Sequence, residues 1–280
     1  MAPQMASISV GAPLRISCSI EDLFRAGNSN LFFLPLAHVL AQALQVAAVT
    51  TGVKTGYATG TQNLAEEFGM FQPRWVLAVP RVLERIYNRA KHTAEAEGKG
   101  RIFDLAASVA IRSSQERQTG RVSLKTRALH FVFDKLVYSR LRNRFGGRLE
   151  YAVSGAAALG ERLGHFFRGI GLTVLEGYGL TETTAAVFFN RPENIKMGTV
   201  GQPAPGATVR IADDGEILLK GHYIFAGYWN DEVATAEAFD PDGWFRTGDV
   251  GELDEDGFLR ITGRKKEIII TSGGKNIAPK

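Results

Sequence analysis

Residues 149–183 read LEYAVSGAAALGERLGHFFRGIGLTVLEGYGLTET, and this stretch decides the fold class. Its apolar runs at 149–153 and 172–175 predict two short buried strands. Between them, residues 159–168 carry apolar side chains at helical spacing. A strand–helix–strand unit of this kind predicts a parallel sheet that binds ligands at the carboxyl ends of its strands. The second strand is expected to lead into a loop that begins at Gly177.

The same alternation occurs upstream, and it changes after Asn190. Residues 74–79 predict a buried strand closed by Pro80 and followed by a helix, and further helices are predicted around 103–115 and 124–144. Beyond Asn190, short segments alternate with Asp-Gly turns, which predicts a small antiparallel β unit with strands at 208–212, 216–220 and 258–262. We therefore expect an α/β fold, with parallel sheets flanked by helices and followed by a small antiparallel β unit.

The composition is that of an ordinary globular protein, with 45% hydrophobic and 22% charged residues and a net charge of +4. The single cysteine, Cys18, excludes an intramolecular disulfide and a cysteine-based metal cluster, and no residue spacing indicates a zinc site. The apolar stretch at 32–49 is interrupted by Pro35 and His38, which makes it a poor membrane span. Because no signal-peptide pattern precedes it, we expect a cytoplasmic protein.

Polar signatures follow one another in the second half of the chain: Gly177-Tyr178-Gly179-Leu180-Thr181-Glu182-Thr183, Arg246-Thr247-Gly248-Asp249 and Gly263-Arg264-Lys265-Lys266-Glu267. They offer the groups that a bound nucleotide needs. Tyr178 has a face on which adenine can stack, Thr181 a hydroxyl for a phosphate oxygen, and Glu182 a carboxylate for Mg²⁺. Asp249 is acceptor-only and suits ribose hydroxyls, while Arg264 offers a planar fork of donors.

Together with Leu34-Pro35-Leu36-Ala37-His38 and residues 153–159, these signatures resemble the AMP-forming acyl-CoA synthetases of the adenylate-forming superfamily, above all bacterial long-chain fatty-acid–CoA ligases. The resemblance implies part of the N-terminal domain of such an enzyme. It also implies that ATP, with Mg²⁺, activates a fatty acid as acyl-AMP, and that the acyl group then passes to CoA. The implied segments are a poorly matched N-terminus at 1–30 and an acyl- and nucleotide-binding portion at 31–190. A small β-rich subdomain follows at 191–262, and a hinge that starts a further domain at 263–280.

The resemblance also implies roles for single residues. Tyr178, between Gly177 and Gly179, would stack on adenine, with Thr181 at a phosphate and Glu182 at Mg²⁺. Gly155, Ala156 and Ala157 would provide the backbone beside the adenine. Relatives often have a second glycine and a proline in this segment, where this chain has Ala156 and Ala158, so a mild change in pocket shape is expected. Asp249 and Arg264 would contact the ribose, Lys266 would act as the hinge, and His38 would lie beside the substrate carboxylate. We interpret His130 and His165, which stand among apolar helical neighbours, as structural.

Basic residues dominate positions 112–148, where only Glu116 and Asp134 oppose them. The simplest interpretation is a solvated helical face. The alternative is a contact with an anionic membrane surface, which would make the protein peripheral at the membrane. We do not expect nucleic acid as a partner, because no recognition motif accompanies the charge.

Two family features do not appear: a Ser/Thr/Gly-rich phosphate loop upstream of the histidine segment, and the lysine of the C-terminal domain. Residues 50–54 mimic the loop, but they are predicted to form a turn at a strand edge. The chain is therefore expected to be truncated at both ends and to show little pyrophosphate exchange by itself. Two alternatives remain open: a fatty-acyl–AMP ligase that uses a carrier protein, and a non-catalytic remnant that binds nucleotide or acyl chains.

Overall fold

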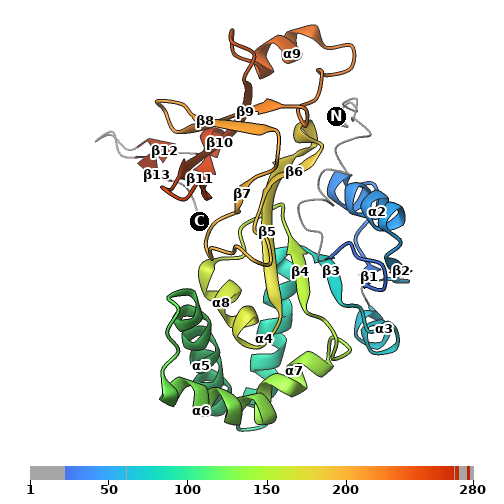
Figure 1. Ribbon diagram of the computed structural model, residues 1–280, viewed down its shortest axis with the longest axis vertical. Coiled ribbons are helices and arrows are strands. Elements are labelled where there is room, and N and C mark those ends of the chain that lie inside the picture. Colours follow the sequence, from blue (N-terminus) through green and yellow to red (C-terminus); the bar gives the residue numbers. More distant parts are fainter. Residues whose placement is uncertain (1–22, 61, 268, 271–275, 278–280) are drawn as a thin grey trace.

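The computed structural model describes residues 23–60, 62–267, 269–270 and 276–277 (Figure 1). Its largest sheet has seven strands in the order β2-β1-β3-β4-β5-β6-β7. The first five strands in this order, β2, β1, β3, β4 and β5, are parallel to one another, whereas β6 pairs antiparallel with β5 and with β7. The strands are β1 (Ser29–Phe32), β2 (Lys54–Tyr57), β3 (Trp75–Ala78), β4 (Tyr151–Ser154), β5 (Thr173–Leu180), β6 (Ala185–Phe189) and β7 (Gln202–Pro203).

Helices cover this sheet, and α4 to α8 gather at the end of the molecule drawn lowest in Figure 1. A five-residue π-helical turn, Asp134–Tyr138, joins α6 to α7. Every described helix is too short or too polar to traverse a lipid bilayer. The helices are α2 (Val39–Thr51), α3 (Leu64–Phe71), α4 (Pro80–Ala96), α5 (Gly100–Gln118), α6 (Leu124–Phe133), α7 (Ser139–Asn143) and α8 (Glu161–Gly169).

Successive residues of the central strands enter two different hydrophobic cores. In β3, Trp75 and Leu77 belong to the core that contains Leu44 of α2. Val76 of the same strand belongs to the core that contains Phe166 of α8. Because neighbouring side chains of a strand point to opposite faces, the two cores lie on opposite faces of the sheet, as the predicted α/β class requires.

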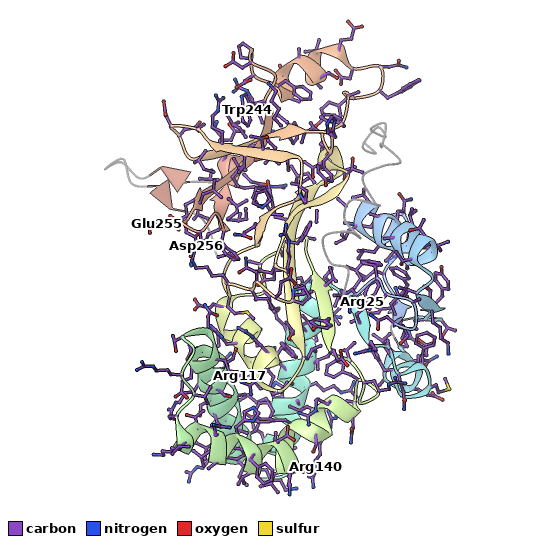
Figure 2. All side chains as sticks on the ribbon, viewed as in Figure 1. Arg25, Arg117, Arg140, Trp244, Glu255 and Asp256 are labelled. Atoms are coloured by element: carbon purple, nitrogen blue, oxygen red, sulfur yellow. The ribbon has the colours of Figure 1, made fainter. Side chains whose placement is uncertain are left out.

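A second sheet, of four antiparallel strands in the order β11-β10-β9-β8, forms the unit after residue 206. Its strands are β8 (Ala207–Ile211), β9 (Glu216–Gly221), β10 (Phe245–Leu253) and β11 (Leu259–Arg264), with α9 (Glu232–Ala238) inserted between β9 and β10. Trp244 in this unit and Arg140 of α7 lie at opposite ends of the molecule (Figure 2). The short strands β12 (Ile269–Ile270) and β13 (Asn276–Ile277) pair with each other.

The predicted fold class is confirmed, and the predicted strands at 74–79, 149–153, 208–212, 216–220 and 258–262 correspond to β3, β4, β8, β9 and β11. The turn expected at 50–54 joins the end of α2 to β2, the edge strand of the large sheet. Residues 1–22, and most of the segment after Glu267, lie outside the described residues.

The prediction of a loop that begins at Gly177 was wrong. Strand β5 continues through Gly177 to Leu180 and pairs antiparallel with β6. The two glycines permit this pairing, because a Cβ on Gly179 would overlap the backbone of Ala185, and one on Gly177 would crowd the carbonyl of Phe188. Tyr178 is therefore held by a strand ladder instead of a loop.

Packing of α5 against α8 gives a stability prediction. A Cβ on Gly169, the last residue of α8, would overlap the backbone of the fully buried Ala110 in α5. Gly169→Ala is therefore expected to lower the free energy of unfolding by about 1–3 kcal/mol, the usual effect of overpacking. Urea denaturation of the chain measures this.

Gly69→Ala in α3 is the matched control, because no described atom beyond its chain neighbours and its own helix backbone lies within 4 Å of the added Cβ. It is expected to leave the stability unchanged or to raise it by up to about 1 kcal/mol, since alanine favours helix more than glycine does. Equal unfolding midpoints for the two variants would contradict the close contact between α5 and α8.

Candidate functional site

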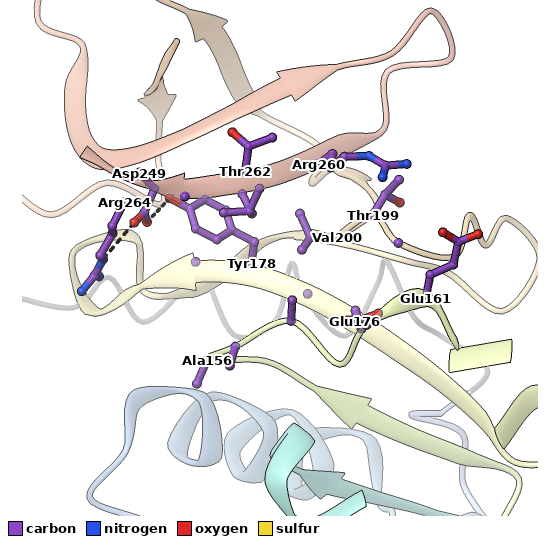
Figure 3. Close-up of a pocket in the computed structure, with 18 of the residues that line it drawn as sticks. Ala156, Glu161, Glu176, Tyr178, Thr199, Val200, Asp249, Arg260, Thr262 and Arg264 are labelled. Carbon is purple, nitrogen blue, oxygen red and sulfur yellow. Dashed lines mark hydrogen bonds and ion pairs between the residues drawn. The ribbon is translucent and has the colours of Figure 1, made fainter. Parts of the chain in front are cut away.

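A cavity of about 620 Å³ opens where the large sheet meets the four-stranded sheet (Figure 3). On one side it is lined by the loop after β4 and by residues 176–180 of β5, and on the other by Asp249 of β10 and residues 260–264 of β11. The predicted site residues that line it are Ala156, Ala157, Gly177, Tyr178, Gly179, Asp249 and Arg264. Residues from distant parts of the chain thus meet here.

Asp249 is the centre of a hydrogen-bonded group that crosses this cavity. Its side chain is 8% exposed, and its Oδ2 accepts a hydrogen bond of 2.7 Å from the Tyr178 hydroxyl. Its Oδ1 accepts one of 2.9 Å from Nε of Arg264 (Figure 3). Burial raises the pKa of Tyr178 well above its usual range, and the charge of Asp249 raises it further, so the phenol remains a donor. The carboxylate is therefore fixed from both sheets.

Local backbone contacts explain how the segment Arg246-Thr247-Gly248-Asp249 places the carboxylate. Asp249 lies opposite Arg264 in the register of β10 and β11. Gly248 adopts a left-handed φ of 70°, and its N–H donates to the buried Glu216 at 3.0 Å. The Thr247 hydroxyl donates to the carbonyl of Ile217 and accepts from the N–H of Asp249. This polar turn within β10 holds the aspartate at one orientation.

Glu182 lies on a 3₁₀ turn, Thr181–Thr183, directly after β5. Its Oε1 accepts a hydrogen bond of 2.9 Å from the hydroxyl of Tyr228, and its carbonyl accepts one of 2.8 Å from the N–H of Phe225. The hydroxyl of Thr184 donates to the carbonyl of Tyr223. Burial, followed by the hydrogen bond to Glu182, raises the pKa of Tyr228 to about 12. The segment after β9 therefore fixes the turn and its carboxylate.

Glu176 is a buried carboxylate on the wall of the same cavity, and the sequence interpretation missed it. Its Oε2 accepts a hydrogen bond of 2.8 Å from the N–H of Leu159. Burial raises the pKa of Glu176, although that hydrogen bond opposes the effect. The only signal in the sequence is a single charge between the apolar run that ends at Leu175 and Gly177.

His38 lies elsewhere, in a smaller apolar cavity of about 210 Å³. His38 is exposed and directly precedes α2. It lines this cavity together with Gly155 and with Leu77 of β3. Ala156, with a left-handed φ of 70°, lines both cavities. The two hollows therefore adjoin at Ala156.

The remaining predicted residues lie outside both cavities. Thr181 is exposed on its turn, and Lys266 is exposed on the 3₁₀ turn Lys265–Glu267 that follows β11. In the described part of the chain, no group of three or more His, Cys, Asp or Glu side chains could hold a metal ion, so Glu182 stands as a single carboxylate. His130 of α6 lies 2.7 Å from the carbonyl oxygen of Gly169 in α8, and the buried His165 of α8 lies 3.0 Å from the hydroxyl of Ser114 in α5. Both histidines therefore join neighbouring helices.

Comparisons with known proteins agree with this architecture. The family described as AMP-binding enzyme matches residues 9–229. Long-chain-fatty-acid–CoA ligase FadD15 of Mycobacterium tuberculosis (strain H37Rv) is 54% identical over 257 residues, which cover 92% of this chain and 43% of that protein. Long-chain-fatty-acid–CoA ligase 1 of Cavia porcellus is 33% identical over 270 residues, or 92% of this chain and 38% of that protein.

Among solved structures, O-succinylbenzoate Coenzyme A synthetase (MenE) from Bacillus subtilis in complex with AMP superimposes with a TM-score of 0.69 at 21% identity. The match covers 100% of this chain and 50% of that chain. ATP-bound MatB from Rhodopseudomonas palustris gives a TM-score of 0.69 at 22% identity, over 99% of this chain and 48% of that chain. The chain thus spans less than half the length of the curated relatives it matches, and the family match begins upstream of Leu31.

Proposed function

Because the chain belongs to the AMP-binding enzyme family, we propose that the whole protein is a long-chain fatty-acid–CoA ligase. The observation that carries this proposal is the 54% identity, over 92% of the chain, to a relative named as a ligase of this kind. In the proposed reaction, an oxygen of the fatty carboxylate attacks the α-phosphorus of ATP, and pyrophosphate leaves. The sulfur of CoA then attacks the acyl carbonyl, so that AMP leaves and the thiol proton is released.

The larger cavity would hold the AMP portion. Its volume of about 620 Å³ lies within the usual range for small-molecule sites. The ring of Tyr178 would stack on adenine, beside the backbone of Ala156 and Ala157. Each oxygen of the Asp249 carboxylate already accepts one hydrogen bond and can accept another, which suits a ribose hydroxyl. Arg264 would donate to the ribose from the same side.

Glu182 would hold Mg²⁺, with Thr181 donating to a phosphate oxygen. Mg²⁺ in proteins often takes one or two carboxylates together with substrate phosphates, so a single carboxylate on this turn fits the ion. When bound, the ion would neutralise charge that develops on the phosphate oxygens. The contribution of the chain is a carboxylate that is held in place by Tyr228 before any ligand binds.

The smaller cavity would receive the end of the fatty acid that carries the carboxylate. Its lining is apolar apart from His38, and it adjoins the nucleotide cavity at Ala156, so a carboxylate beside His38 would face the α-phosphate. Lys266, exposed directly after β11, would be the hinge between the two half-reactions. Contact of residues 112–148 with an anionic membrane, from which the fatty acid would be taken, completes the proposal.

The test supplies the whole protein with ATP, Mg²⁺, a long-chain fatty acid and CoA, and follows AMP and acyl-CoA together. Formation of both, dependent on CoA, is the expected result. Transfer of the acyl group to a carrier protein but not to CoA would instead identify a fatty-acyl–AMP ligase. Nucleotide binding without turnover would identify a non-catalytic protein and overturn the proposal.

Tyr228 is expected to act as a positioning residue for Glu182. Tyr228→Phe removes the hydroxyl that donates to Oε1, and a hydrogen bond to a charged group contributes about 1.5–3 kcal/mol, or roughly 10- to 100-fold in rate or affinity. We therefore expect the Mg²⁺ concentration for half-maximal turnover to rise and kcat to fall. Titration of turnover with Mg²⁺ measures both effects.

Two controls separate this effect from general damage. AMP affinity should be unchanged, because Tyr178 and Asp249 keep their contacts. Tyr57→Phe removes an exposed hydroxyl on the edge strand β2, where the partner is Gln45, and should leave turnover unaltered. A Tyr228→Phe variant with the wild-type Mg²⁺ dependence would contradict the positioning role.

A further inference from the structure

One face of α6 and the following π-helical turn exposes large apolar side chains to solvent. Leu124 is 82% exposed and Phe131 62% exposed, and Val132 and Leu136 are also about half exposed. Positions 124, 128, 131, 132 and 135 lie on one side of a helix. The opposite side is buried and carries Thr126, Phe133 and Tyr138. The helix therefore has a second apolar side that packs against neither hydrophobic core of the described residues.

Cations surround these apolar side chains. Lys125, Arg127 and Lys135 are exposed on the same elements, and Arg140 is exposed on the adjoining α7. None of these four cations forms an ion pair with the described residues. Nζ of Lys135 lies 4.6 Å from the centre of the Phe131 ring, so charge and apolar surface are directly adjacent. We call the set Leu124, Lys125, Arg127, Phe131, Val132, Lys135, Leu136 and Arg140 the α6 face.

The two acidic residues of positions 112–148, Glu116 and Asp134, already interact with neighbouring groups of the protein. Glu116 accepts hydrogen bonds from the backbone N–H of Ser123, at 2.8 Å, and from the hydroxyl of Thr126, at 3.0 Å. Asp134 pairs with Arg142 at 2.6 Å. Arg142 is therefore neutralised inside the helical end, while Lys125, Arg127 and Lys135 of the α6 face have no ion-pair partner among the described residues.

A groove of about 360 Å³ extends this apolar surface toward α5. Leu136 and Arg140 of the α6 face line it, together with Ile102, Phe103 and Val137. Its polar lining includes Arg144 and the ion pair of Lys99 with Glu97, whose charged atoms lie 2.8 Å apart. Figure 2 shows Arg140 at this end of the molecule, far from Trp244 in the four-stranded sheet. A flat partner on this end would leave the nucleotide cavity open to water.

We propose that the α6 face docks on an anionic lipid bilayer, with Leu124, Phe131 and Leu136 entering the layer below the headgroups. The cations around them contact headgroup phosphates and carboxylates, which is the arrangement of helices that lie in a membrane interface. Apolar side chains have no counterpart on a nucleic-acid backbone, and the positive charge opposes pairing with a second copy of the same face. The inference rests on the proposed function only in that a lipid-derived substrate makes a bilayer the natural partner.

The test is co-sedimentation of the whole protein with vesicles of phosphatidylcholine alone and of phosphatidylcholine mixed with phosphatidylserine. Binding is expected only to the anionic vesicles, and it should fall as salt rises above about 0.1 M, where exposed charges are screened within about 10 Å. Phe131→Ser and the double variant Lys125→Glu, Lys135→Glu are each expected to weaken partitioning about tenfold or more.

Met70→Ser in α3 and Val233→Ser in α9 are matched controls, because both side chains are 72% exposed at other places on the molecule. They should bind vesicles as the wild type does. AMP affinity reports folding in every variant. Equal binding to neutral and anionic vesicles, wild-type binding by both α6 variants, or sedimentation with RNA but not with vesicles would overturn the inference.

Vesicle binding requires no turnover, so the two proposals can fail separately. An inactive protein that binds anionic vesicles through the α6 face would overturn the proposed ligase activity alone. An active ligase that binds no vesicles would overturn the docking surface alone.

Discussion

Glu182→Ala is expected to abolish acyl-CoA formation by the whole protein. The variant removes the carboxylate proposed to hold Mg²⁺, and Glu182 is fixed in the apoprotein by Tyr228 and by the N–H of Phe225. Loss of one preorganised electrostatic group commonly lowers kcat by about 10²–10³-fold, and loss of a metal ligand should approach the upper figure. Steady-state assays of AMP and acyl-CoA formation, with ATP, Mg²⁺, fatty acid and CoA supplied, measure the effect.

Two further variants show whether the charge or the hydrogen bond matters. Glu182→Gln keeps an acceptor for Tyr228 but loses the charge, so we expect it to be nearly as inactive as Glu182→Ala. Glu237→Ala removes an exposed carboxylate of α9 and should leave turnover unchanged. Near-wild-type turnover in Glu182→Ala would assign the metal to another residue.

The second large effect is expected at Asp249. Asp249→Ala should weaken AMP binding by about 1–3 kcal/mol, because it removes the proposed acceptor for the ribose and leaves Tyr178 and Arg264 without the carboxylate that both contact. Isothermal calorimetry with AMP measures this loss.

Tyr178→Phe is the matched variant, because it keeps the ring and removes only the hydroxyl that donates to Asp249. It is expected to weaken AMP binding less than Asp249→Ala does, since the stacking surface remains. Unchanged AMP affinity in Asp249→Ala would contradict the ribose assignment. An equal loss in both variants would instead indicate that the hydrogen-bonded pair acts as one unit.

Local periodicity was sufficient to predict much of the fold. Buried strands such as β3 and β4 are short apolar runs, and their patterns do not depend on distant partners. Strand β10 was missed because it contains Arg246, Thr247 and Gly248, which are typical of a turn. The end of β5 was misplaced for a related reason. Glycine favours turns in isolation, but at Gly179 it permits close pairing with β6.

Most of the motif residues lie together, but the contacts that orient them could not be predicted. Tyr178, Asp249 and Arg264 come from separate signatures, and each lines the same cavity. The hydrogen bond between Tyr228 and Glu182 joins residues 46 apart in the sequence, and no local pattern encodes that distance. Glu176 was missed because its burial, which raises its pKa, depends on packing around β5.

The two cavities are built from different strands, and this separation has an evolutionary consequence. Among the described residues, the two linings share Ala156. Tyr178, Asp249 and Arg264 line the larger cavity, whereas His38 and Leu77 line the smaller one. Substitutions that reshape the smaller hollow can therefore accumulate without disturbing the carboxylate group of the larger one. Such an arrangement allows descendants of one ancestor to diverge in the acid they accept while they inherit the same nucleotide-binding residues.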